Sequence, residues 1–238
     1  GFGSAETRGE SLDYIDLLKD AEGTIPKSLF EGIDITWNRV AGGAAIAPLV
    51  QALESSFDFK SPSKSIPQLL RIHQSILALP ASDWKRIKLA DCEKLIKDCL
   101  GLFVELRTNK FKASPGSELL VTLEVINRSN TEVRLVSMEV TSNDNVFALP
   151  STLVYNQGYT KELTIQTPEQ LSIPYWLIKH PEEGMYKVDQ QKKRGTPADP
   201  PSITAAVKIE INGTSITLQA PVIYKTVDPA EGEVIRPL

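Results

Sequence analysis

Few residues in this chain could do chemistry. Its 238 residues include two histidines, His73 and His180, and two cysteines, Cys92 and Cys99. A structural zinc site needs close Cys/His pairs, and these four residues are scattered. Seven residues apart on one helical face, the two cysteines would lie about 10.5 Å apart along the axis, whereas a disulfide needs Cα atoms within about 7 Å. We therefore expect small, buried thiols and no disulfide.

The segment His180-Pro181-Glu182-Glu183 could open a zinc site if a second histidine and another carboxylate joined it. The only other histidine, His73, falls on a helical stripe with Leu69 and Ile76 and is interpreted as a hydrogen-bonded core residue. We interpret residues 179–183 as an exposed turn and predict no metal and no cofactor.

Nucleophilic catalysis finds no better support in the sequence. A Gly-x-Ser-x-Gly elbow and a glycine-rich phosphate loop are both absent. Cys99 lies on an apolar helical face, where a thiol is inert. The paired carboxylates Glu182-Glu183 and Glu231/Glu233 are expected to be solvated. The sequence therefore predicts no catalytic residues in this chain.

Aromatic residues offer a different kind of site. Residues 167–202 form a long segment, rich in Pro, Lys and Gln, that does not fit the strand pattern on either side. Loops this long in compact domains are usually functional, interface-forming or disordered. Their apolar anchors Tyr175, Trp176, Met185 and Tyr186 suit packing against a neighbouring domain or stacking on sugar rings. We predict an interface or glycan-contact surface here.

The sequence pattern of the elements that position this surface changes from helix to strand near residue 110. Before it, apolar residues recur at helical spacing. Ser65-Ile66-Pro67-Gln68 has the pattern of a capping box that starts a helix ending before Pro80, and Ser82 begins the next helix. We expect that helix to carry its apolar stripe as far as Leu102 and Phe103. The short connection predicts a helical hairpin, joined by a helix over residues 44–57 and a short one over residues 12–21. Trp37 and Trp84 are expected in the core.

After residue 110, β-branched alternation predicts six or seven short antiparallel strands. They are expected at residues 119–126, 133–140, 160–166, 207–211 and 215–218, with residues 222–224 extending the last strand and turns at 127–131 and at Asn212-Gly213. The predicted fold class is α+β, with a helical region over residues 1–108 and an immunoglobulin-like β-sandwich over residues 109–238.

Composition narrows the classes of function. A net charge of −4 disfavours a nucleic-acid binder. No apolar run approaches the roughly 18 residues that a membrane span needs. The first residues, Gly1-Phe2-Gly3-Ser4, resemble the end left by cleavage of a longer polypeptide, so we expect the chain to be a fragment of a longer protein.

Several strings together resemble a known family. They are residues 30–37 (FEGIDITW), 173–177 (IPYWL), 184–186 (GMY), 228–233 (DPAEGE) and 236–238 (RPL). The combination is similar to the region downstream of the catalytic domain in large GlcNAc-phosphatidylinositol de-N-acetylase (LmbE-like) proteins of Bacteroidetes, and the resemblance covers residues 30–238.

In that family an upstream α/β domain carries a His-Pro-Asp-Asp zinc motif that this chain lacks. The resemblance implies a non-catalytic accessory segment of a secreted sugar de-N-acetylase. Its partner would be the upstream catalytic domain of the same protein, and its location periplasmic or extracellular. A stand-alone glycan-binding or adhesion module is the alternative.

Overall fold

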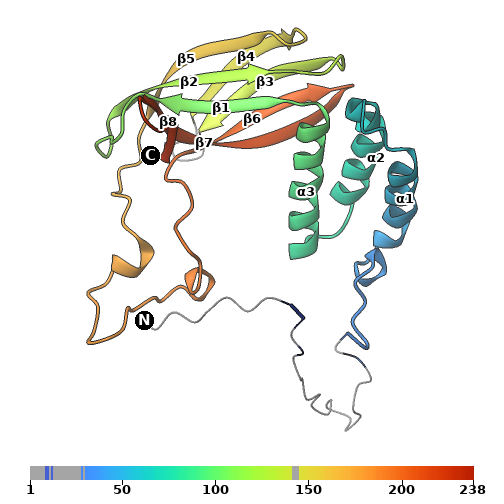
Figure 1. Cartoon of the computed structure of the whole chain (residues 1–238), viewed down its shortest axis with the longest axis horizontal. Helices are drawn as coiled ribbons and strands as arrows, with labels where there is room; N and C mark the ends of the chain where they lie inside the picture. Colours follow the sequence, from blue (N-terminus) through green and yellow to red (C-terminus); the bar gives the residue numbers. More distant parts are fainter. Residues whose placement is uncertain (1–8, 11, 13–27, 29, 141–144) are drawn as a thin grey trace.

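A computed structural model describes residues 9, 10, 12, 28, 30–140 and 145–238. It has a mixed α+β architecture, in which a group of helices hangs from one end of a large sheet (Figure 1). The helices are α1 (Ile46–Ser56), α2 (Ile66–Leu77) and α3 (Asp83–Cys99), and the strands are β1 (Phe103–Thr108), β2 (Glu118–Ile126), β3 (Val133–Val140), β4 (Asn145–Leu153), β5 (Gly158–Gln166), β6 (Thr204–Ile211), β7 (Thr214–Asp228) and β8 (Gly232–Pro237). The α+β class predicted from the sequence is confirmed.

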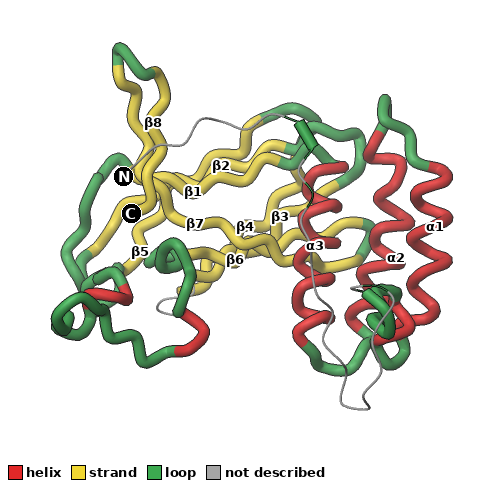
Figure 2. Tube along the Cα trace, turned by 60° about the horizontal axis from the view of Figure 1, so that its bottom comes forward, coloured by secondary structure: helices red, strands yellow, loops and turns green. Residues whose placement is uncertain are grey.

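The three helices lie side by side with α2 in the middle (Figure 2). Helices α2 and α3 form the predicted hairpin, since only five residues connect them. Lys85, in the first turn of α3, donates to the carbonyl oxygens of Leu77 and Leu79 (both 2.7 Å) and so caps the end of α2. The expected helix over residues 44–57 is α1, and the one over residues 12–21 lies outside the described residues except for Leu12.

The two expected helix starts differ. The Ser82 side chain accepts a hydrogen bond from the Lys85 amide, so it is the N-cap of α3. Ser65 is itself helical (φ −77°, ψ −12°) and caps nothing, because the 3-10 turn Pro62–Ser65 runs directly into α2. The predicted capping box was wrong, and the Gln68 side chain instead accepts from the Ser56 hydroxyl (3.2 Å).

Helix α3 also ends earlier than its apolar stripe suggested. Gly101 adopts a left-handed conformation (φ +58°), and the amide of Leu102 donates to the carbonyl of Lys97 (3.0 Å), which closes the helix in a Schellman motif. Phe103 therefore opens strand β1, and residues 103–108 belong to the sheet although the sequence placed them with the helices. The division into two independent units stays a prediction.

The strands form one continuous sheet in the order β4-β3-β6-β7-β1-β2-β5, with β8 paired to β7. Strand β7 joins its two halves: residues 214–221 pair with β6, while the later residues pair with β1 and β8. The sheet curves until it is nearly barrel-like, so two separate sandwich layers are not evident. Strands β1 and β7 run parallel, which departs from the all-antiparallel expectation.

Alternation along the strands builds the core. On β2, for example, Leu119, Val121, Leu123 and Val125 are all fully buried on the inner face. The Asn212-Gly213 turn between β6 and β7 is confirmed, with both residues at positive φ. Within the described part of the chain, no helix is long and apolar enough to cross a membrane.

A candidate interaction surface

The predicted surface lies on a long excursion, residues 167–202, between β5 and β6. It leaves the sheet at the end away from the helices (Figure 1). Its base is tied to the sheet at Thr167, whose hydroxyl donates to the carbonyl of Ser114 (2.7 Å) and accepts from the amide of Ser117 (2.9 Å). Two short 3-10 helices, Tyr175–Leu177 and Gln191–Lys193, are its only regular helical turns.

Asp199 holds these two turns together. Its carboxylate accepts a hydrogen bond from the Tyr175 amide (2.7 Å) and another from the Lys193 ammonium (3.0 Å). The Lys193 hydrogen bond lowers the pKa of Asp199 from its usual value of 3.8, and the Tyr175 amide adds to the effect. The Tyr175 hydroxyl donates to the carbonyl of Thr196 (2.9 Å). The excursion is thus folded by polar contacts within itself.

These contacts bring the four candidate residues together. The rings of Tyr175 and Trp176 meet edge to face, with centroids 4.9 Å apart. Reciprocal backbone hydrogen bonds between Glu182 and Met185 close a turn that presents Met185 and Tyr186. All four candidates, Tyr175, Trp176, Met185 and Tyr186, line one hollow of about 700 Å³.

The excursion leaves much apolar side-chain surface uncovered. Met185 is 68% exposed and Tyr186 is 56% exposed. We call the following set the apolar excursion surface: Leu171, Ile173, Leu177, Ile178, Met185 and Tyr186, all exposed large hydrophobic residues of this one segment. So many exposed large hydrophobic side chains on one segment make it a candidate for contact with a partner.

The residues that the sequence offered as possible metal ligands, His180, Glu182 and Glu183, are not arranged as a metal site. His180 is exposed, and its Nδ1 lies 2.9 Å from the carbonyl oxygen of Pro181, while Glu182 pairs with Lys187. Residues 179–183 are exposed, as predicted, and the turn itself is closed between Glu182 and Met185. Among the residues that the structure describes, no group of three or more His, Cys, Asp or Glu side chains could hold a metal ion. The donor set does not fit the zinc of the resembling family.

His73 is the core residue that its stripe predicted. It is buried on α2, with Nε2 3.3 Å from a Glu93 carboxylate oxygen on α3, and its Nδ1 has no hydrogen-bond partner. Cys92 is buried and Cys99 half-buried, and neither forms a disulfide. Burial raises the pKa of the Cys92 thiol to about 12, which keeps it protonated and unreactive.

The predicted core position of Trp84 was wrong. The sequence placed it in the core, but it is 42% exposed on α3, with the Arg39 guanidinium stacked over its ring at 3.5 Å from the centroid. The amphipathic ring lies at the rim of an apolar hollow rather than inside the helical core.

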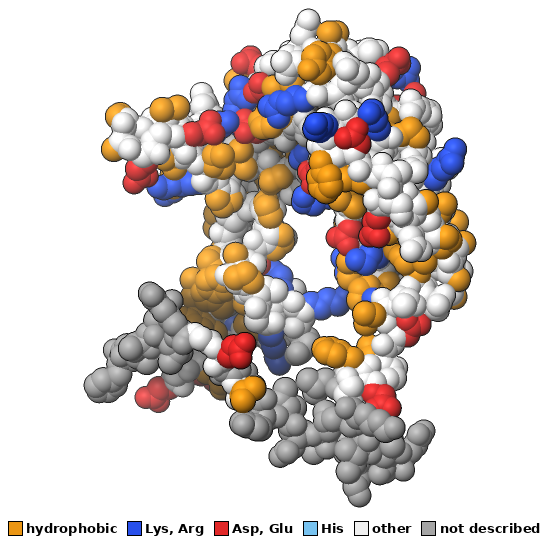
Figure 3. Space-filling model, turned by 45° about the vertical axis from the view of Figure 1, so that its right-hand side comes forward, with side chains coloured by type: hydrophobic (Ala, Val, Ile, Leu, Met, Phe, Trp, Pro, Cys, Tyr) orange, Lys and Arg blue, Asp and Glu red, His pale blue; other side chains and the backbone are white. Residues whose placement is uncertain are grey.

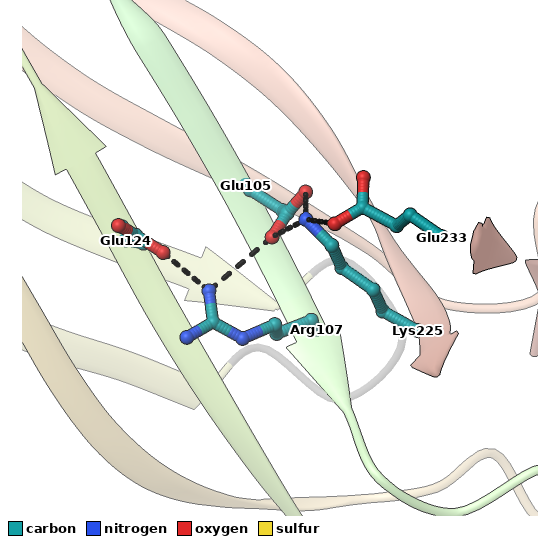
Figure 4. Close-up of polar contacts among 5 residues, drawn as sticks. All are labelled: Glu105, Arg107, Glu124, Lys225 and Glu233. Carbon is teal, nitrogen blue, oxygen red and sulfur yellow. Dashed lines mark hydrogen bonds and ion pairs between the residues drawn. The ribbon is translucent and has the colours of Figure 1, made fainter. Parts of the chain in front are cut away.

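A charged network on the outer face of the sheet was missed by the sequence analysis (Figure 4). Glu105 on β1 is almost buried, and its carboxylate accepts from Lys225 on β7 (3.1 Å) and from Arg107 (3.2 Å). Arg107 also pairs with Glu124 on β2, and Lys225 with Glu233 on β8 (2.8 Å).

These pairs tie four strands together. The Glu124 hydrogen bond raises the pKa of Arg107, and the Glu233 hydrogen bond raises that of Lys225, so both cations stay charged. The network was not predicted because residues 103–108 were expected to be part of the helical region. As a strand, they place Glu105 and Arg107 on the same face. The contacts of the network join neighbouring strands, so its role is to stabilise the sheet.

Comparisons with known proteins give no family. No protein-family model matches the chain, and no curated protein does. One similar solved structure is the Pseudomonas fluorescens alkylpurine DNA glycosylase AlkC bound to DNA containing an abasic site analog, at 9% identity and a TM-score of 0.20. The match covers 73% of this chain and 51% of that one, so this chain spans about half the length of AlkC. A likeness this low carries no argument about function.

Proposed function

We propose that this chain is a non-catalytic accessory segment of a sugar de-N-acetylase, and that the apolar excursion surface packs on the upstream catalytic domain. The observation that carries the proposal is that one folded excursion exposes six large hydrophobic side chains. Burying such a side chain is worth about 1.5–3 kcal/mol, so a partner domain that covers several of them gains substantial binding energy.

The local hydrogen bonds support the same role. Asp199 and Tyr175 fix the backbone of the excursion, so that less conformational entropy is lost when a partner binds. Rigid aromatic side chains and adaptable methionines are both enriched at the centres of protein interfaces, and both line this hollow. The identity of the partner rests on the family resemblance of residues 30–238.

The first test is the coding sequence immediately upstream of Gly1. The proposal expects an apolar strand that leads into a His-Pro-Asp-Asp motif. A start codon or a signal peptide at that position would remove the catalytic partner and leave the stand-alone module as the better account.

The second test measures binding between the upstream domain and this chain. Replacing Tyr186, which belongs to the apolar excursion surface and is 56% exposed, with Ala is expected to weaken the affinity at least tenfold while leaving the unfolding midpoint nearly unchanged. Tyr155→Ala, which removes an exposed ring from the loop between β4 and β5, is the matched control. Equal affinities of Tyr186→Ala and the unmodified chain would refute the proposed contact.

A glycan-binding or adhesion module is the second candidate. It is favoured by the arrangement of Tyr175, Trp176 and Tyr186 around a hollow of about 700 Å³, a size that accommodates a small ligand. Chitin oligosaccharides should then quench the tryptophan fluorescence saturably. Tyr186→Ala is the informative variant because Tyr175 also anchors the excursion, and quenching that survives in Tyr186→Ala would argue against this site.

We further propose that the sheet has immunoglobulin-like topology. The strands fall into two groups, β4-β3-β6 and β1-β2-β5, joined through β7, and β1 runs parallel to the second half of β7. An experimental structure with two layers packed at about −30° would agree with this assignment. Hydrogen bonds between β4 and β5 that close a barrel would contradict it.

A further inference from the structure

A separate hollow lies at the base of the excursion, between the segment that leaves β5 and the segment that returns to β6. It has a volume of about 300 Å³, which is near the lower end of the range for small-molecule sites. Its hydrophobic lining comes from three parts of the chain: Phe111 and Pro115 on the loop between β1 and β2, Leu171 on the excursion, and Ile203 just before β6.

A few polar side chains complete the lining. Lys112 is its only charged side chain. Gln170, Ser172 and Ser202 also line the hollow, and their side chains form no hydrogen bond with any part of the chain that the structure describes. A mostly apolar hollow with a small number of free polar groups is the usual form of a site for a small organic molecule.

The Lys112 ammonium has no acidic partner among the described residues. It lies 5.7 Å from the centre of the Phe111 ring, close to the limit of about 6 Å for a cation–π contact. The Arg236 guanidinium lies 5.6 Å from the centre of the same ring. The acidic residue Glu169, next to the excursion wall in sequence, does not line the hollow. Two cations thus flank a ring of the lining, and their positive potential favours an anionic occupant.

The apolar lining alone would not distinguish this hollow from others. Hydrophobic side chains reach the surface at several places, interspersed with charged ones (Figure 3). The apolar hollow beside Trp84 also contains a lysine, but Lys88 there already pairs with Asp91 (2.9 Å). The free ammonium of Lys112 is therefore the feature that indicates the chemistry of the ligand.

We propose that the hollow at the base of the excursion binds a small organic anion, with one carboxylate on a short apolar body. The carboxylate pairs with Lys112, and the body lies against Phe111 and Leu171. A carboxylate accepts charge-assisted hydrogen bonds from an ammonium. One lysine in the lining matches its single charge, whereas a phosphate monoester carries nearly two. The inference goes beyond the proposed function and does not depend on it, because its test uses this chain alone.

Titration of the chain with benzoate, followed by NMR of the backbone amides, tests the proposal. Benzoate should shift the amides of Lys112, Leu171 and Ile203 saturably. The neutral analogue benzyl alcohol, which has nearly the same body, should bind at least tenfold more weakly. Lys112→Gln should weaken benzoate binding at least tenfold and leave the unfolding midpoint unchanged, because Lys112 is exposed. Lys161→Gln, at an exposed lysine on β5, is the matched control and should bind like the unmodified chain.

Four results would overturn the proposal. Benzoate shifts that do not saturate would show that the hollow holds no such anion. Equal affinities for benzoate and benzyl alcohol would mean that the apolar lining acts alone. Unchanged affinity in Lys112→Gln would place the carboxylate elsewhere. Phenyl phosphate that binds at least tenfold more tightly than benzoate would assign the site to a phosphate instead.

Discussion

At the scale of single residues, Asp199 connects the two halves of the excursion. Asp199→Asn would keep the shape of the side chain but remove the charge that holds Lys193 and strengthens the Tyr175 contact. We expect faster hydrogen exchange of the Tyr175 amide and faster proteolysis within residues 167–202. The global unfolding midpoint should change little, because both hydrogen-bond partners of Asp199 belong to the excursion itself.

The same carboxylate sets a pH dependence. Its pKa is lower in the folded excursion than the usual 3.8, so its stabilising effect is complete above pH 3.8 and is lost as the pH falls through the lowered value. Exchange of the Tyr175 amide, corrected for its intrinsic pH dependence, should therefore accelerate only in acid. The Asp199→Asn variant should show no such acceleration, and identical profiles would contradict the role of Asp199.

The two thiols provide a second prediction at this scale. Cys92 is buried with a pKa of about 12, whereas Cys99 is half-buried and its pKa is raised less, by burial and by Asp98. In the folded chain, Ellman's reagent should modify Cys99 first, and the Cys99→Ser variant should react only as fast as the chain unfolds. Rapid labelling of Cys99→Ser would show that Cys92 is accessible.

At the scale of elements, Ser82 and Ser65 both precede helices, and replacing each with alanine compares a serine that caps a helix with one that does not. Ser82→Ala should destabilise the chain by about 1 kcal/mol, because the hydroxyl caps the Lys85 amide. Ser65→Ala should cost less, because no helix amide donates to its side chain. Urea denaturation of both variants measures the difference, and equal losses would contradict the assigned caps.

Gly101 lies in the short connection between α3 and β1, and it can be compared with Gly116 in a second pair of variants. An alanine there would be strained at φ +58° and would place its Cβ 3.1 Å from the Cβ of Arg128. Gly101→Ala should therefore destabilise by at least about 1–2 kcal/mol. Gly116→Ala has a similar φ of +67° but open space around it, so thermal or urea unfolding should show a smaller loss. A larger loss in Gly116→Ala would contradict the close packing at Gly101.

The elements also show what the sequence could and could not predict. Strands with clean alternation, such as β2 and β6, were found because one face is buried and the other is not. Strand β4 was missed because Pro150 interrupts it, which an edge strand tolerates. Strand β8 was missed because nearly all its residues are exposed, so it has no alternation to detect. The end of α3 depends on Gly101, whose left-handed conformation overrides the apolar stripe.

The candidate site was predicted in part. The length and the aromatic content of residues 167–202 indicated an anchored surface, and the structure places Tyr175, Trp176, Met185 and Tyr186 around one hollow. The role of Asp199 could not be predicted, because it joins residues 24 positions apart through a backbone amide. The hollow at the base of the excursion was also missed, since residues far apart in the sequence line it.

At the scale of the whole molecule, the excursion and the helices lie at opposite ends of the sheet (Figure 2). The proposed interface is therefore separate from the helical region, and variants in the helices should leave it unaffected. The sheet lies between them, and the Glu105 network links four of its strands, β1, β2, β7 and β8.

The two methionines of the chain allow the most direct test of the proposed interface. Met185 is 68% exposed on the excursion, whereas Met138 is fully buried in the sheet and reports on global unfolding. Peroxide oxidation should be measured in this chain alone and in the proposed longer protein, in which an upstream catalytic domain precedes it. The account predicts that Met185 oxidises rapidly in the chain alone and at least tenfold more slowly in the longer protein, with Met138 protected in both. Equal rates for Met185 in the two proteins would contradict the claim that the excursion is covered by a neighbouring domain.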